Sequence, residues 1–315
     1  MISKLLSCLT LFVTVQSLVS SASAARLECS GLFKDPAAVQ ELSLNLPQKY
    51  QYRPAPTGVR DFSEIKELKI MSFNVENFFW KPTQAQIQAR LAEQQQYIRQ
   101  QKVPSWYLWG RPLVWQAQKN QSSGMGKNDD IKPEFEIERI RQITDDEYPD
   151  LMIATEIESQ QALEHLASKG LKDKYKSYLI EGNDSRGIDI GFLVKVDLPF
   201  FIEQQTHKDM LWPLDGRQVR IFSRDVPALL LSKSKGEKPF LIVLGNHAKS
   251  KRDGDGDPLS NKLRTAQYEA MAKIITEYQK QFPNTPIVLG GDFNTQVNTA
   301  REVQPILPLV KSGFL

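Results

Sequence analysis

Short apolar segments with polar residues near one end recur along the chain from residue 68 onward. Alternating apolar and polar residues, or a compact apolar run between turn signals, is typical of a β-strand. This pattern predicts five strands, at residues 68–75, 151–154, 188–194, 240–244 and 287–289. The polar residues after the second of these strands begin with Glu156, which we expect just beyond the strand.

Helical patterns separate some of these strands. Apolar residues fall near helical spacing within 134–143, and residues 266–281 have a similar pattern before the last strand. Residues 83–102 are rich in Gln, Ala and Arg and contain few helix breakers, which predicts a solvent-facing helix.

An aromatic stretch follows the 83–102 segment and contains Trp106, Tyr107, Trp109 and Trp115. Such rings can stack on bases or sugars, or contact a membrane. More commonly they pack a helix against the core, and we expect that role here. Membrane contact through this stretch remains an alternative.

The first 24 residues have the pattern of a secretory leader. Lys4 precedes an apolar run at 5–19, and small residues follow, ending in Ala22-Ser23-Ala24. A positive start, an apolar run and an A-x-A end predict a signal peptide cleaved after Ala24. A membrane anchor is the alternative, but the run contains polar residues and is shorter than the roughly 20 residues a bilayer span needs. We therefore expect a secreted or periplasmic protein.

Composition indicates a globular chain without a strong charge bias. The 315 residues are 41% hydrophobic and 24% charged, and the formal net charge is +3. This is enough apolar material for a substantial core. The charge balance does not by itself indicate a polyanionic partner.

Polar residues near the ends of four predicted strands are the strongest candidates for chemistry. They are Asn74, Glu156, Asn246-His247 and the Asp292-Phe293-Asn294 segment. A rigid sheet commonly holds catalytic groups at such positions. Each alone has an ordinary reading, since Asp and Asn also cap turns and a lone His is often structural.

Taken in order, five motifs resemble the endonuclease/exonuclease/phosphatase family. That family includes deoxyribonucleases, abasic-site endonucleases, inositol polyphosphate phosphatases and bacterial sphingomyelinases. The motifs in this sequence are Met71-Ser72-Phe73-Asn74-Val75-Glu76-Asn77, residues 150–158 with Glu156, Arg186-Gly187-Ile188-Asp189-Ile190, Gly245-Asn246-His247-Ala248-Lys249-Ser250 and Gly290-Gly291-Asp292-Phe293-Asn294.

The resemblance implies a fold and a set of roles. The implied fold is α/β, a four-layer sandwich of two packed mixed β-sheets flanked by helices. Asn74 and Glu156 match the metal-binding pair, for which the expected ion is Mg²⁺, with Mn²⁺ or Ca²⁺ as alternatives. Asp292 and Asn294 match the pair that positions the attacking water and the phosphoryl group, and His247 matches a phosphate-contacting or acid histidine.

Two further residues are candidates for substrate binding. Arg186 could hold a phosphate through both arms of its guanidinium group, and Asp189 could orient a neighbouring group. An arginine in a turn and a carboxylate paired at the surface are equally ordinary readings of the same residues.

The resemblance also sets the expected domain boundaries. Residues 25–67 form an N-terminal extension, 68–315 form the family domain, and a helical and aromatic insertion occupies about 80–130. Family members carry a closing Asp-His pair after the Gly-Asp-Phe-Asn motif, and no histidine follows Asn294 here. We therefore expect a domain that lacks its last strands and has little activity.

The segment after His247 invites a calcium-loop reading, because residues 253, 255 and 257 are aspartates. Arg264, however, occupies the twelfth position, where an EF-hand loop has its bidentate glutamate. A flexible loop near the substrate fits this segment better.

The resulting functional prediction is an exported metal-dependent endonuclease with nucleic acid as its substrate. Alternatives are a phospholipid or inositol-phosphate hydrolase of the same fold and a non-catalytic binding protein. No obligate protein partner is evident from the sequence.

Overall fold

The computed structural model describes residues 12–16, 53–79, 134–184, 187–251, 256–295 and 303–314. Several predictions lie outside these ranges. They concern the 83–102 helix, the aromatic stretch, Arg186, most of the expected leader and the 252–255 part of the acidic loop.

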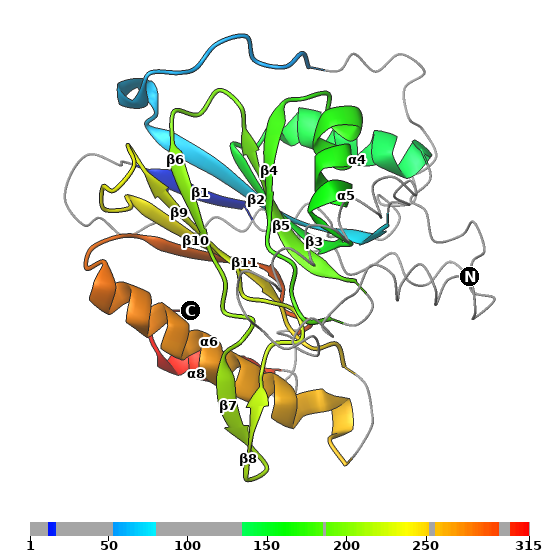
Figure 1. Cartoon of the computed structure of the whole chain (residues 1–315), viewed down its shortest axis with the longest axis vertical. Coiled ribbons are helices and arrows are strands. Elements are labelled where there is room, and N and C mark those ends of the chain that lie inside the picture. Colours follow the sequence, from blue (N-terminus) through cyan, green and yellow to red (C-terminus); the bar gives the residue numbers. More distant parts are fainter. Residues whose placement is uncertain are drawn as a thin grey trace, which may run out of the picture.

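Two mixed β-sheets form the centre of the molecule (Figure 1). The first has the strand order β1-β2-β3-β5-β4, with β2 parallel to β3 and the other neighbours antiparallel. Its strands are Phe12–Gln16 (β1), Glu67–Phe78 (β2), Leu151–Ile157 (β3), Tyr175–Leu179 (β4) and Asp189–Lys195 (β5).

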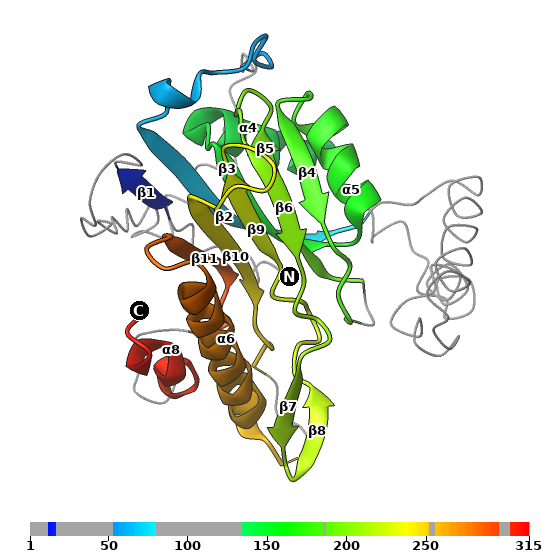
Figure 2. The ribbon, with the colours of Figure 1, turned by 60° about the vertical axis from the view of Figure 1, so that its left-hand side comes forward.

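The second sheet has the order β11-β10-β9-β6, with β10 parallel to β11 and the other pairs antiparallel. Its strands are Phe201–Gln205 (β6), Ala228–Ser232 (β9), Leu241–His247 (β10) and Ile287–Asp292 (β11). Leu211–Leu214 (β7) and Arg217–Arg220 (β8) form a separate hairpin that projects beside the start of a long helix, α6 (Figure 2).

Helices cover the outer face of each sheet. One group lies on the first sheet and comprises Glu134–Glu147 (α4), Gln160–His165 (α5) and a π-helical turn at Leu166–Gly170. The other lies on the second sheet and comprises Asn261–Gln281 (α6) and Leu307–Lys311 (α8). Short 3₁₀ turns occur at Phe62–Glu64, Pro258–Ser260 and Gln304–Ile306.

The apolar residues divide among three cores, and this division produces the layers. Ile153 of β3, Val243 of β10 and Val288 of β11 belong to the core between the sheets. Met152 faces α4 and α5, and Leu244 faces α6. Because neighbouring residues of a strand point to opposite faces, strands that are apolar on both faces are buried on both sides. The predicted four-layer sandwich is confirmed.

The five predicted strands and two of the predicted helices occur, and most of them extend beyond their predicted ends. Two of these extensions concern residues near the candidate chemistry. The β3 strand continues through Glu156, so this residue is not beyond the strand as expected. The α6 helix begins at Asn261 rather than near residue 266, because the Asp257 carboxylate caps it by accepting hydrogen bonds from the N–H groups of Lys262 and Leu263.

Residues 12–16, which fall within the expected leader, form β1 and pair antiparallel with β2. Cleavage after Ala24 would remove this strand from the edge of the first sheet. Within the described residues, no helix is long and apolar enough to cross a bilayer.

Candidate metal-binding active site

The candidate site lies at one end of the core between the sheets. Along β2, the side chains of residues 68 and 70 enter this core. Asn74 is an even number of residues further on, so its side chain faces the same side of the strand. His247 continues the row of residues 241 and 243, and Asp292 continues the row of residue 288. These side chains are the last inward-facing positions of three strands, which is why polar groups meet where the apolar core ends.

Glu156 joins this group through an irregularity in β3. Thr155 pairs with Asn74, so strict alternation would point Glu156 toward the helices on the outer face. The registers of β2 with β3 and of β3 with β5 both shift here, and Glu156 has a positive φ of 67°. A bulge of this kind redirects a side chain. Here it brings the Glu156 carboxylate to the Asn74 amide.

The four side chains lie close together. The Asn74 Nδ2 donates hydrogen bonds to Glu156 Oε1 at 3.1 Å and to Asp292 Oδ2 at 3.2 Å. The His247 Nε2 lies 3.8 Å from Glu156 Oε1 and 3.8 Å from Asp292 Oδ2. The structure therefore brings together Asn74, Glu156, His247 and Asp292, which lie far apart in the sequence.

Two glycines allow β11 to reach this position. A Cβ atom on Gly290 would lie 2.5 Å from the side chain of Ile153 in the opposite sheet. Gly291 has a φ of 128°, and a Cβ atom there would lie 1.9 Å from the Asn246 carbonyl oxygen. Gly291 requires a residue without a side chain, because its backbone approaches that of Asn246 so closely. At Gly290 an added Cβ atom would force the Ile153 side chain to move.

Asn294 follows in a turn that is tied to the neighbouring strand. Its backbone N–H donates to Asp292 Oδ1 at 2.7 Å, and its side-chain Nδ2 donates to the Ala248 carbonyl at 2.9 Å. Its φ is 47°, in the left-handed region that asparagine tolerates better than most residues. The turn therefore orients Asp292 and fixes Asn294 beside the residue that follows His247.

A buried arginine that the sequence analysis did not single out supports the same turn. The Arg224 Nη1 donates to the Ala248 carbonyl at 3.1 Å, and its Nε lies 3.2 Å from a carboxylate oxygen of Asp184. The Ala248 carbonyl thus accepts hydrogen bonds from both Arg224 and Asn294. No spacing in the sequence indicated Arg224, because its contacts are to residues distant along the chain.

The pKa of Asp292 is raised above its ordinary value. Burial is the main cause, and the neighbouring Glu156 carboxylate raises the pKa further. Hydrogen bonds from Asn294 and Asn74 and the charge of Arg224 oppose these effects. Two carboxylates held together in a partly buried place favour either a proton or a cation between them.

The donor set fits a divalent cation. One ligand atom from each of Glu156, His247 and Asp292 lies within 4.8 Å of the others. Two ligands on opposite sides of a cation, at about 2.1–2.4 Å each, span a similar distance. Carboxylate oxygens suit Mg²⁺, Mn²⁺ and Ca²⁺, and imidazole is compatible with several divalent metals.

The other candidates are placed differently. Asp189 lies at the start of β5, where its buried carboxylate accepts a hydrogen bond from the Gly182 N–H at 2.9 Å. It is not part of the Glu156, His247 and Asp292 cluster. His207, another of the chain's three histidines, is not part of the cluster either. Its Nδ1 contacts the Val226 carbonyl.

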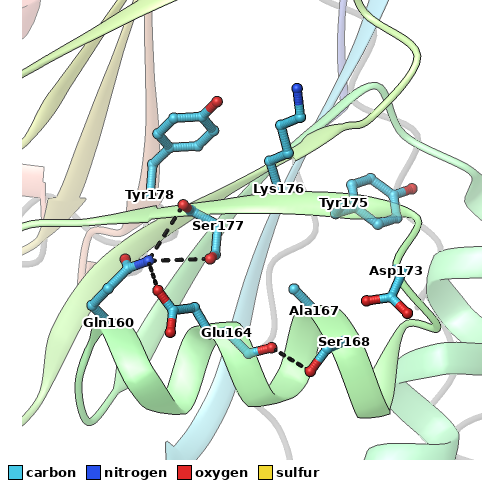
Figure 3. Close-up of a pocket in the computed structure, with 9 residues that line it drawn as sticks. All are labelled: Gln160, Glu164, Ala167, Ser168, Asp173, Tyr175, Lys176, Ser177 and Tyr178. Atoms are coloured by element: carbon cyan, nitrogen blue, oxygen red, sulfur yellow. Dashed lines mark hydrogen bonds between the residues drawn. The ribbon is translucent and has the colours of Figure 1, made fainter. Parts of the chain in front are cut away.

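A surface groove of about 470 Å³ lies elsewhere, between α5 and β4 (Figure 3). It shares no residue with the candidate site. Gln160 of α5 donates to the Ser177 hydroxyl at 3.2 Å and to Glu164 at 2.8 Å, so its amide binds polar groups of both elements. We assign the groove no catalytic role.

One known protein family matches the part of the chain that contains most of this site. The model of the Endonuclease/Exonuclease/phosphatase family matches residues 129–307, which is more than half of the chain. The chain belongs to this family. The matched range includes Glu156, His247, Asp292 and Asn294, whereas Asn74 precedes it. The predicted membership in the endonuclease/exonuclease/phosphatase family is confirmed, and a search of curated proteins found no match.

Several solved structures are similar to parts of the chain. TDP2 from C. elegans is 20% identical with a TM-score of 0.36, covering 51% of this chain and 42% of that protein. Sphingomyelinase C from Streptomyces griseocarneus is 18% identical with a TM-score of 0.37, covering 55% and 62%. The human Nocturnin catalytic domain, with bound sulfate, is 14% identical with a TM-score of 0.40, covering 57% and 64%. The chain spans less than two thirds of each.

The raised pKa of Asp292 predicts a stabilising substitution. A carboxylate whose pKa is higher in the folded state destabilises that state when ionised, and the penalty disappears below the unfolded pKa, near 4. In metal-free protein at neutral pH, Asp292→Asn should therefore raise the free energy of unfolding by about 1 kcal/mol. Thermal unfolding in EDTA at pH 7 and at about pH 3 tests this. A lower melting temperature for the variant at pH 7 would contradict it.

Proposed function

We propose that the protein is a divalent-metal-dependent phosphodiesterase that acts on nucleic acid. The proposal rests on one observation, the convergence of Asn74, Glu156, His247 and Asp292 from four strands of two sheets. A site of this composition at the end of a rigid sandwich suits the hydrolysis of an anionic ester.

Glu156 and Asp292 would hold the cation, with the Asn74 amide beside both carboxylates. A bound divalent cation would supply Lewis-acid polarisation of a phosphoryl oxygen and offset the negative charge of the phosphate. We propose Mg²⁺ as the ion, with Mn²⁺ and Ca²⁺ as alternatives.

Asn294 and His247 would act on the substrate itself. Asn294 is held beside Asp292 and Ala248, where its side chain can position the phosphoryl group. His247 lies next to both carboxylates, where it can contact a phosphate oxygen or donate a proton to the leaving group. Asp292 would also orient the attacking water through its carboxylate.

Support for nucleic acid as the substrate comes from the motif around His247. The segment Gly245-Asn246-His247-Ala248-Lys249-Ser250 resembles the deoxyribonuclease branch of the family. In the structure, His247 and Asp292 are direct neighbours on adjacent parallel strands. This pairing keeps the His247 side chain next to the Asp292 carboxylate.

A substrate panel tests the proposal. The 315-residue chain should nick plasmid DNA and hydrolyse bis-p-nitrophenyl phosphate with Mg²⁺ at the low rate expected without a closing Asp-His pair, and EDTA should abolish both reactions. Sphingomyelin vesicles and an inositol polyphosphate serve as the comparison substrates. Hydrolysis of lipid without cleavage of DNA would overturn the assignment of nucleic acid, and no hydrolysis of any ester would overturn the phosphodiesterase assignment.

We further propose that the protein is exported, on the strength of the leader pattern in residues 1–24. Expression in a bacterial host followed by fractionation and N-terminal sequencing tests this. A protein that begins at Ala25 in the periplasm or medium is the expected result. An unprocessed chain that stays in the cytoplasm would contradict the proposal.

A further inference from the structure

The α6 helix carries two buried polar side chains whose contacts lead directly to the candidate site. Arg264 and Gln267 are three residues apart, so they lie on the same face of the helix. Their exposed fractions are 0% and 3%.

Arg264 holds the turn that follows β11. Its Nη2 donates to the Asn294 carbonyl at 2.6 Å and also to the Thr295 hydroxyl. One turn of helix further on, the Tyr268 hydroxyl donates to the Phe293 carbonyl. Burial raises the pKa of Tyr268 to about 12, so this hydroxyl remains a donor at neutral pH. Through these contacts α6 fixes the backbone of a turn whose central residue, Asn294, has a positive φ.

Gln267 holds the chain that follows β10. Its Oε1 accepts a hydrogen bond from the Lys249 N–H at 2.9 Å, and its Nε2 donates to the Ile221 carbonyl at 3.0 Å. Lys249 comes two residues after His247. One helix therefore ties down both segments that leave the site from the second sheet.

In the part of the chain that the structure describes, the buried Arg264 guanidinium group binds neutral oxygens. Among the described residues it forms no ion pair, and its Nε and Nη1 have no hydrogen-bond partner. Burying a charge without a counter-charge is unfavourable, and an apolar residue of similar size is often as stable or more stable in such a place. The two contacts to residues 294 and 295 are what an apolar residue could not supply.

We propose that Arg264 and Gln267 are positioning residues of the candidate site, which keep Asp292, Asn294 and His247 in place before substrate binds. Arg264 acts through Asn294, whose N–H orients Asp292, and Gln267 acts through the segment after His247. The proposal rests on the proposed phosphodiesterase function for its kinetic consequence. Its structural consequence can be measured without turnover.

The test compares Arg264→Met, Arg264→Lys and Gln267→Met with Arg141→Met as a matched control. Arg141 is also buried, at 5% exposure, but its Nε donates to the Gly170 carbonyl on the outer side of the first sheet. We measure kcat and KM for bis-p-nitrophenyl phosphate, thermal stability, and amide hydrogen exchange in peptides covering 287–295 and 245–251.

In Arg264→Met we expect kcat to fall about 10–100-fold with little change in KM, as for other residues that support a site indirectly. Exchange should become faster in 287–295, and Arg264→Lys should restore part of both properties. Gln267→Met should act on 245–251 in the same way. Arg141→Met should lower stability without changing kcat or exchange at either peptide.

Unchanged exchange in 287–295 together with unchanged kcat in Arg264→Met would overturn the proposal. If Arg264→Met does not fold, Arg264→Lys decides by the same two measurements. If the wild type hydrolyses no phosphodiester, the proposed function fails, and the exchange data alone still support or overturn the positioning role.

Discussion

Glu156→Gln and Asp292→Asn should each lower kcat for bis-p-nitrophenyl phosphate about a thousandfold, an effect like that of removing a direct transition-state contact in other enzymes. Each substitution keeps the shape of the side chain and removes the negative charge that faces the proposed cation. Asn74 Nδ2 and His247 Nε2 approach both carboxylates, so the two acids face the same place in the site. Steady-state kinetics with Mg²⁺ provides the measurement.

Glu164→Gln is the matched control for this experiment. Glu164 lies in the groove between α5 and β4, where it accepts a hydrogen bond from Gln160 (Figure 3). The same chemical change there should leave kcat within twofold of wild type. Activity above a tenth of wild type in both site variants would show that these carboxylates do not carry the reaction.

Lys174→Met should lower the free energy of unfolding by about 3–5 kcal/mol, because it leaves a carboxylate buried without its counter-charge. Lys174 and Asp145 form an ion pair in which both side chains are fully buried. The Arg53 N–H also donates to Asp145 at 3.2 Å. Burial lowers the pKa of Lys174 while Asp145 opposes that change. Urea unfolding followed by circular dichroism measures the loss.

The double variant Lys174→Met with Asp145→Leu separates the ion pair from packing. It removes both charges, so it should lose less stability than Lys174→Met alone. Asp145 lies in α4, before the start of β3, whereas Glu156 lies near the end of that strand. Metal affinity should therefore stay unchanged in both variants. A loss below about 1 kcal/mol in Lys174→Met would contradict the predicted cost of the unpaired carboxylate.

The strands could be predicted because their cause is local, whereas the layers were predicted from the resemblance to the family. Alternation and apolar runs determine which residues of a strand face a core, and the polar residues Asn74, His247 and Asp292 continue those rows. Parallel pairing then places His247 beside Asp292. The meeting of these side chains follows from the pattern together with the pairing of the strands.

Other parts of the site depend on departures from local rules. Strict alternation along β3 would point the Glu156 side chain away from Asn74. The bulge in β3 turns this side chain toward Asn74. Arg224 and Arg264 reach the site through contacts with backbone carbonyls at distant positions. Any residue can present a backbone carbonyl, so the sequence contains no side-chain pattern that identifies such a partner. This explains why the sequence indicated Arg264 only as a position that does not fit a calcium loop.

The most direct test of the central claim is Mn²⁺ binding by the purified 315-residue chain, measured by isothermal titration calorimetry beside Glu156→Gln, Asp292→Asn and Glu164→Gln. We expect saturable binding by the wild type and by Glu164→Gln, with at least tenfold weaker binding in the two site variants. Equal binding by all four proteins, or none by the wild type, would contradict the assignment of Glu156 and Asp292 as the residues that hold the cation.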